Sequence, residues 1–451
     1  MPKTLLILAA IFLAALAWIA HLSNPVHAFP SMLAGVVVAT AAWLALVIRL
    51  LRGSLVLSRR GILLGFAVAI AARALLLLPP APLSDDLYRY LWDGRVSSSG
   101  INPYRYAPSS PELAHLRDSN WRLINHPGIP TIYPPLAQQF FRLMEEASMP
   151  PRGVRAIAAA LDVSVMGIFA AIFLRRSKSA ALALIHGWCP LAILESAGGG
   201  HVDALGIFLL ALACWAADHL RSAHSAARSG FLAGMFLSAS AMVKLIPAAV
   251  APAFLPRRPA KWIALFALGI LVPLLVFLPY LDAGPHLGEG LKAYAENWHF
   301  NDLTFTPLVR AGVDPLDARR VLAAAFSLAA LVIPWLTRDL LAAIGLVWFA
   351  FLALSPTVHA WYGLWLVPFL VTLPALWRPA AIALAALLPL SYIAPWWQAR
   401  TGLAEEPAWN RLVVWIPVLI LLAGTIGKRA LRGKSCRESC ARQEECPGSF
   451  Q

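Results

Sequence analysis

Five charged side chains stand close together just after the third apolar stretch of this chain. Asp85, Asp86 and Asp93 alternate with Arg89 and Arg95, directly behind a run of apolar residues. A charged group held at membrane depth is costly and marks a functional requirement. These acids stand where a membrane-spanning helix should surface, which favours chemistry at a membrane–water boundary.

Asp85 and Asp86 are the catalytic candidates. Neighbouring residues on a helix point about 100° apart, so one carboxylate can face a reacting group while the other pairs with Arg89 or Arg95. A carboxylate in a partly dry setting has a raised pKa, which suits a general base. Ser84 or Asp85 could equally cap a short helix over 86–96. Both roles are compatible, and the sequence does not choose between the two aspartates.

Cationic side chains are the candidates for binding a phosphate group. The guanidinium groups of Arg89 and Arg95 match phosphate oxygens, with salt bridges to acids such as Asp93 as the alternative. Lys244 is flanked by apolar residues on both sides. Its charge must meet an anion or reach water, and a phosphate head group is the natural partner. Snorkelling to the surface is the other possibility.

A glycine-rich segment, 195–203, opens a later apolar helix. Its three consecutive glycines let the backbone approach a ligand, and a helix N-terminus offers free N–H groups to an anion. His201 and Asp203 could bind sugar hydroxyls or phosphate. The two could also bind a metal, but no third ligand is adjacent, so we expect neither a metal nor a cofactor.

Several aromatic and histidine side chains complete the substrate-binding candidates: Tyr133, His299, His359 and Tyr362. Aromatic rings stack on sugars, and they also concentrate at membrane interfaces. The histidines favour substrate contact, whereas interfacial anchoring is the alternative for each.

The composition places the positioning elements in a membrane. Of the 451 residues, 59% are hydrophobic and only 13% are charged, and the mean hydropathy is +0.68. A soluble domain carries about a quarter charged residues. The net charge of +14 falls mostly in short loops, which is the positive-inside pattern of membrane proteins and argues against nucleic-acid binding.

The apolar stretches predict an all-α, polytopic transmembrane bundle of about 13 segments, with large outer loops that carry short interfacial helices. The segments are 5–22, 32–50, 62–78, 156–174, 180–194, 204–220, 231–255, 262–281, 321–336, 340–354, 361–376, 380–395 and 412–427. We expect one domain over 1–427, with outer loops 79–155 and 282–320, and a basic cytoplasmic tail over 428–451.

The basic loops predict cytoplasmic N- and C-termini in a multi-pass protein of the inner (plasma) membrane. Segment 231–255 must then begin and end on the cytoplasmic side, although it is too short for two spans at about 1.5 Å per residue. We therefore expect a helix broken near Lys244, with an ordinary kinked helix as the alternative. This topology gathers the polar clusters on the extracytoplasmic face.

An enzyme on that face needs a membrane-borne activated donor. No Gly-x-x-x-x-Gly-Lys-Ser/Thr motif is present, and no segment resembles a nucleotide-binding domain. Membrane lipids and a lipid-linked substrate are therefore the expected partners.

The order and sidedness of these motifs carry a family resemblance over roughly residues 60–400. The acidic pair, the Gly-Gly-Gly-His-x-Asp-Ala-Leu helix start, the Lys-x-x-Pro break and the late His-x-Trp-Tyr resemble the GT-C superfamily of integral membrane glycosyltransferases. Within it, the chain looks most like bacterial polyprenyl-phosphate-mannose-dependent mannosyltransferases. The superfamily usually places its acidic loop after the first helix, whereas two extra apolar segments precede the loop here.

This resemblance implies transfer of a hexose, mannose by analogy, from a polyprenyl-phosphate donor to a lipid or glycan acceptor. It implies an inverting displacement in which Asp85 or Asp86 deprotonates the acceptor, while Lys244, Arg89 and His201 hold the departing phosphate. A surface-polysaccharide polymerase or ligase is one alternative. A transporter of lipid-linked saccharides would show internal repeats, and none is visible; a non-catalytic assembly subunit would not need the acids and cations together.

Overall fold

The computed structural model describes residues 3–219, 223–256, 258–402 and 406–444. Within these ranges the protein is all-helical, as predicted, and its one β-type pairing is an isolated bridge between Phe300 and Thr357. The longer apolar helices are α1 (Lys3–Ala20), α2 (Phe29–Leu51), α3 (Arg59–Leu76), α6 (Pro151–Arg175), α9 (Asp203–His219), α10 (Ala223–Ala241), α11 (Ala260–Leu274), α14 (Pro315–Leu336), α15 (Leu340–Leu354), α17 (Arg378–Leu387) and α19 (Ala408–Glu444).

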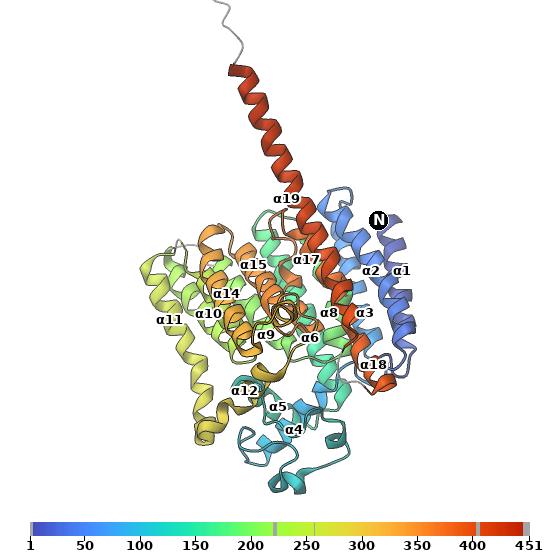
Figure 1. The fold of residues 1–451 in the computed structure, drawn as a ribbon, viewed down its shortest axis with the longest axis vertical. Coiled ribbons are helices and arrows are strands. Elements are labelled where there is room, and N and C mark those ends of the chain that lie inside the picture. The colour runs from blue at the N-terminus through green and yellow to red at the C-terminus, as the bar shows by residue number, and fades with distance from the viewer. Residues whose placement is uncertain (1–2, 220–222, 257, 403–405, 445–451) are drawn as a thin grey trace, which may run out of the picture.

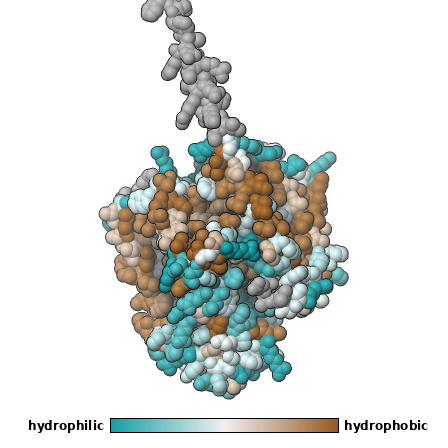
Figure 2. Space-filling view, viewed as in Figure 1, coloured by the Kyte–Doolittle hydropathy of each residue, from teal (hydrophilic) through white to brown (hydrophobic). Residues whose placement is uncertain are grey.

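Six stretches of the described chain are long and apolar enough to cross a membrane. They are Lys3–Ala20, Phe29–Leu51, Pro151–Arg175, Ala260–Asn297, Arg378–Thr401 and Ala408–Arg429. A seventh exists if the pair Ala180–Gly187 and Pro190–Gly198, bent by 62°, counts as one span. The predicted count of about 13 is not confirmed, because several apolar segments form helices that are short, bent or rich in arginine. Figure 2 shows a hydrophobic band between hydrophilic ends on the visible face.

Local signals in the sequence explain where several helices begin. The Ser58 hydroxyl accepts a hydrogen bond from the Gly61 amide at the start of α3, and the Asp339 carboxylate accepts one from Ala342 at the start of α15. Proline occupies the first position of α5 (Pro135–Glu146) and of α6, where its missing N–H costs no helical hydrogen bond.

The N-terminal hairpin of α1 and α2 belongs to the common core. The Trp43 indole donates to the Ile185 carbonyl at 2.8 Å, and the Trp188 indole donates to the Gly65 carbonyl at 2.9 Å. Phe12 of α1 stacks on Trp188 with ring centroids 5.1 Å apart. The two extra N-terminal helices, α1 and α2, are therefore integrated into the bundle.

The helix is interrupted near Lys244, where the sequence predicted a break. Helix α10 ends at Ala241, and the 3₁₀ segment η5 (Ile246–Phe254) begins after Lys244. The carbonyl of Met242, freed by the break, accepts hydrogen bonds from the amides of Leu136 and Ala137 at 3.0 and 3.3 Å. The break thus satisfies the N-terminus of α5 and joins the bundle to the first long loop.

The two long loops fold into a helical cap. The first loop contains α4 (Asp86–Ser98), η1 (Pro111–Leu116), η2 (Asn120–Leu123) and α5, and the second contains α12 (Glu289–Asn297) and α13 (Phe305–Arg310). Helices α4 and α5 approach each other closely because Gly94 has no side chain. A Cβ atom at this position would lie 2.3 Å from the Phe141 carbonyl oxygen. Figure 1 shows α4, α5 and α12 at the end opposite the N-terminus and the far end of α19.

A buried ion cluster fixes the segments beneath the cap. Asp162 of α6 accepts from the Arg73 guanidinium and lies 2.9 Å from His186 Nε2. The Ser196 hydroxyl also reaches Asp162, at 3.2 Å. Because these side chains are buried, the paired charges hold the glycine-rich segment in one position relative to α3 and α6.

Candidate active site

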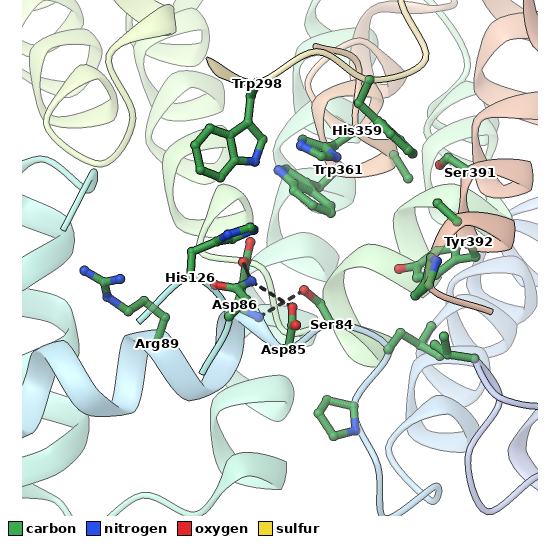
Figure 3. Close-up of a pocket in the computed structure, with 18 of the residues that line it drawn as sticks. Ser84, Asp85, Asp86, Arg89, His126, Trp298, His359, Trp361, Ser391 and Tyr392 are labelled. Carbon is green, nitrogen blue, oxygen red and sulfur yellow. Dashed lines mark hydrogen bonds between the residues drawn. The ribbon is translucent and has the colours of Figure 1, made fainter. Parts of the chain in front are cut away.

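A cavity of about 680 Å³ lies where the cap meets the bundle. Figure 3 shows Asp85 and Asp86 between Arg89 on one side and Ser391 and Tyr392 on the other, with Trp298, His359 and Trp361 across from them. Of the sequence-predicted site residues, those that line the cavity are Asp85, Asp86, Arg89, Tyr133, Lys244, His359 and Tyr362.

The acidic pair stands at the start of α4, held by one amide. The side-chain nitrogen of Asn125 donates to Asp85 Oδ1 and to Asp86 Oδ1, both at 2.9 Å. The Ser84 hydroxyl accepts from the Asp86 backbone amide at 3.3 Å, so Ser84 helps to begin the helix. Both carboxylates are thereby turned toward the cavity.

Asp85 has the proton affinity of a base that works near neutral pH. Enclosure by the cavity walls and the neighbouring Asp86 charge raise the pKa of Asp85 to about 6, while the Asn125 hydrogen bond lowers it. Asp85 nonetheless faces open space within the cavity. A carboxylate with this pKa is mostly ionised at pH 7 and can still accept a proton in a transition state.

One guanidinium nitrogen of Arg89 is buried and has no hydrogen-bond acceptor among the described residues. Its Nε donates to Asp93 Oδ1 at 2.8 Å, and Asp93 Oδ2 accepts from Thr131 at 2.5 Å and from Gln138 at 3.2 Å. Nη2 of Arg89 is buried and makes no hydrogen bond within the described residues. Arg89 is thus oriented by Asp93 and keeps donor capacity for an anion.

Lys244 has an internal partner as well as a place on the cavity wall. Its Nζ donates to Asp203 Oδ1 at 2.7 Å, and the Trp365 indole donates to the same oxygen at 2.5 Å. Nζ also lies 4.5 Å above the Tyr362 ring, whose hydroxyl is 2.6 Å from that of Tyr294. The anion that Lys244 requires is therefore present in the protein itself.

A column of four stacked rings begins in the wall opposite the acids and ends at the buried His201, near Asp86. Phe300 stacks on His359 at 4.9 Å, His359 on Trp361 at 4.2 Å, and Trp361 on His201 at 4.4 Å between ring centroids. The Phe300 backbone is anchored by hydrogen bonds to residues 356 and 358. Because both faces of Trp361 are covered, only its edge can reach the cavity.

The structure places the remaining sequence-predicted residues outside the cavity lining. Asp93 and Asp203 are buried partners of cations that do line the cavity. Arg95 forms salt bridges within the cap, to Asp118 at 2.7 Å and to Glu145 at 3.0 Å, so its charge is satisfied away from the acidic pair. His299 packs beside Phe305, and His201 is fully buried behind Trp361.

Other cavity residues were not among the candidates from the sequence: Asn125, His126, Tyr294, Trp298, Trp361 and Tyr392. The Asn-His-Pro run at 125–127 and the Trp of the His-x-Trp-Tyr motif were visible in the sequence. His126 has a backbone φ of 44° and contacts Trp298 at 4.7 Å. Burial lowers the pKa of His126, so it is neutral at pH 7.

The arrangement combines two carboxylates, an open pocket and two cations in its lining. Such a set can deprotonate a hydroxyl and bind an anionic group in the same cavity. Within the described part of the chain, no three His, Cys, Asp or Glu side chains converge in a metal-binding group. That the reaction needs no metal stays a prediction.

Comparison with known proteins gives a family. Residues 7–258 match the family model described as Alpha-(1->6)-mannopyranosyltransferase, N-terminal domain (MptA_B family). The match includes the N-terminal hairpin, the acidic pair, the glycine-rich segment and Lys244. No curated protein and no solved structure matches the chain. Because the family model spans more than half of the 451 residues, the chain belongs to this family of mannosyltransferases, which is of the GT-C type that the sequence resembled.

Proposed function

We propose that this protein transfers a mannosyl group from a polyprenyl-phosphate donor to a hydroxyl of a lipid or glycan acceptor, on the extracytoplasmic face of the membrane. The observation that carries the proposal is the cavity at the junction of bundle and cap, where Asp85 and Asp86 face open space and Arg89 and Lys244 also belong to the lining. The mannosyltransferase family supports the sugar and the reaction class.

In this mechanism Asp85 is the general base. Its carboxylate takes the proton of the acceptor hydroxyl as the hydroxyl oxygen attacks the anomeric carbon of the donor. The bond between that carbon and the phosphate oxygen breaks, and the electron pair leaves with the polyprenyl phosphate. A single displacement of this kind inverts the anomeric configuration. The carboxylate of Asp86, beside Asp85, favours positive charge that develops on the sugar.

The leaving phosphate is held by Arg89 and Lys244. The unsatisfied Nη2 of Arg89 offers a donor for a phosphate oxygen, and Arg89 is already oriented by Asp93. Each cation is paired with an acid of the protein, Arg89 with Asp93 at 2.8 Å and Lys244 with Asp203 at 2.7 Å. Both therefore contribute directional hydrogen bonds to the phosphate more than net charge.

The charge distribution and the shape of the molecule support this choice of membrane face. The basic loops 49–60 and 175–178 lie at helix ends opposite the cap, on the side of the N-terminus. Lys and Arg are retained on the cytoplasmic side of membrane proteins. This supports cytoplasmic termini and an extracytoplasmic cap, where nucleotide sugars are not supplied and a lipid-linked donor is.

The test is sugar transfer by the purified protein from radiolabelled polyprenyl phosphomannose to lipid and glycan extracts. Asp85→Asn removes the base, and we expect kcat to fall by about 10²-fold or more. Asp86→Asn should also reduce transfer, with a smaller loss. Glu145→Gln is the matched control, since Glu145 is a carboxylate of the cap that bridges to Arg95 outside the cavity.

Two results would overturn this proposal. One is no transfer from any polyprenyl-phosphate sugar by folded protein, which would favour transport of a lipid-linked saccharide. The other is full activity in Asp85→Asn with a loss in Asp86→Asn alone, which would move the base to Asp86.

A further inference from the structure

Two fully buried side chains, Glu195 and His201, lie directly behind the acidic pair. Each has a relative exposure of 0%. His201 Nε2 lies 3.2 Å from Glu195 Oε2, but the contact is an ion-pair approach and not an aligned hydrogen bond. Neither carboxylate oxygen of Glu195 and neither ring nitrogen of His201 makes a hydrogen bond within the described residues. A buried polar set of this kind requires a physical reason.

His201 connects Glu195 to the cavity floor. Its other nitrogen, Nδ1, lies 3.8 Å from Asp86 Oδ2, and one face of its ring is covered by Trp361 at 4.4 Å. The imidazole thus stands between two carboxylates, one fully buried and one on the cavity wall. The Trp361 face also stabilises a positive charge on the ring.

The charges around His201 favour its protonated form. A buried ionised carboxylate without a cation is strongly unfavourable, and the imidazole is the group in contact with Glu195 that can become cationic. Burial lowers the pKa of His201, but Glu195, Asp86 and Asp203 raise it, and the net change is upward.

The other elements packed against this pair do not supply a competing charge at the ring. The guanidinium group of Arg155, in α6, donates hydrogen bonds to the backbone carbonyls of residues 76, 79 and 197. His359 is neutral within the ring column, since burial and Lys244 depress its pKa to about 3. Tyr392 faces Glu195 from the segment η8 (Leu388–Tyr392), and Asp85 lies beyond Asp86.

We propose that Glu195 and His201 are positioning residues for the acidic pair. Glu195 holds His201 as an imidazolium, and His201 holds Asp86 as a carboxylate directed at the cavity, so that Asp85 is the one that accepts the proton. The assignment of the reaction to Asp85 rests on the function proposed above. Neighbouring carboxylates with different surroundings divide their roles in this way.

The first test is the pH dependence of kcat/KM in Glu195→Gln and His201→Gln. Each change removes the positive charge next to Asp86, so the acidic pair should hold its proton to higher pH. We expect the acidic limb of the profile to move up by about one pH unit. The double variant should show no further shift, because Glu195 acts through His201.

Asp218→Asn is the control for the loss of a buried carboxylate. Asp218 is buried near the far end of α9 and shares Arg176 with Asp339. The Asp218→Asn variant should leave the acidic limb of the kcat/KM profile at the wild-type pH. A purely structural role for Glu195 would lower the amount of folded protein and the rate at every pH without moving the limb, and that result would overturn the proposal.

A second measurement does not depend on turnover. Infrared difference spectra recorded across a pH titration report carboxyl protonation, and Asp85→Asn and Asp86→Asn assign the bands. In Glu195→Gln and in His201→Gln the bands of the acidic pair should titrate at higher pH than in the wild type. Spectra that superimpose on the wild type would overturn the positioning role even if sugar transfer is active, whereas shifted bands in an inactive protein would uphold it and refute only the proposed reaction.

Discussion

Asp85 and Asp86 are adjacent in sequence but stand in different surroundings. Asp85 has Asn125 as its hydrogen-bonding partner and faces the open cavity. Asp86 shares Asn125 and also approaches His201 at 3.8 Å. His201 therefore makes its close contact with Asp86, so two identical carboxyl groups have different neighbours.

Removing the Asn125 amide tests the proton affinity of Asp85. In Asn125→Ala the carboxylate loses the hydrogen bond that lowers its pKa, so its pKa should rise from about 6. Because the base must be ionised, activity should be lost at a higher pH than in the wild type as the pH falls. We expect the acidic limb of kcat/KM to move up by about half a unit or more. An unchanged limb with a uniform loss of rate would assign Asn125 to substrate binding instead.

Residue types could be predicted from the sequence better than their partners could. Isolation in apolar sequence singled out Lys244, but its partner Asp203, and Trp365, which donates to the same Asp203 oxygen, are distant in the chain. Arg95 looked equivalent to Arg89, yet acids at 118 and 145 satisfy it inside the cap. Glu195 was visible in the glycine-rich segment, but only the fold brings it against His201. Pairing is set by packing between helices, which local sequence does not encode.

The Lys244–Asp203 pair stabilises the place where three elements meet. These elements are α9, the break after α10, and α16 (Ala360–Leu364). Asp203 is buried and Lys244 nearly so, and removing one charge of such a pair leaves the other uncompensated. Lys244→Met should lower the free energy of unfolding by roughly 3 kcal/mol, measured as denaturation in detergent. Adding Asp203→Asn should recover much of that loss.

The same variants separate stability from function. If Lys244 also contacts the donor phosphate, the double variant should regain stability without regaining donor affinity. Lys292→Met is the matched control, since Lys292 is exposed and reaches Glu296 only at 4.0 Å. Losses that simply add in the double variant would show that the two side chains do not act as a pair.

Helices were predicted where apolar runs were continuous, and the break near Lys244 was predicted from an apolar stretch too short for two spans. The bend between Ala180–Gly187 and Pro190–Gly198 was missed, because its apolar run continues unbroken through Cys189 and Pro190. Pro190 cannot continue the preceding helix, and Arg73 donates to the Gly187 carbonyl at 2.8 Å, which anchors the chain at the turn. Hydropathy alone cannot report such an anchor.

The molecule has two unlike ends, and the proposed function requires that they face different compartments. The cap carries the cavity, and the N-terminus lies at the other end with the basic loops (Figure 1). Ser109 is exposed in the cap, and Ser54 is exposed in the loop between α2 and α3. A single cysteine placed at either position reports which compartment that end of the molecule faces. The background protein has serine at Cys436, Cys440 and Cys446 and keeps the buried Cys189 and Cys214.

A membrane-impermeant maleimide should label Ser109→Cys in intact cells and Ser54→Cys only after the membrane is opened. The physical reason is that arginines 49, 52, 59 and 60 favour a cytoplasmic α2–α3 loop, which would place the cap on the opposite face of the membrane. Equal labelling of both positions after opening the membrane controls for reactivity. The reverse pattern would place the cavity in the cytoplasm, where nucleotide sugars are supplied. That result would remove the argument for a polyprenyl-phosphate donor while leaving the family and the acidic pair as they stand.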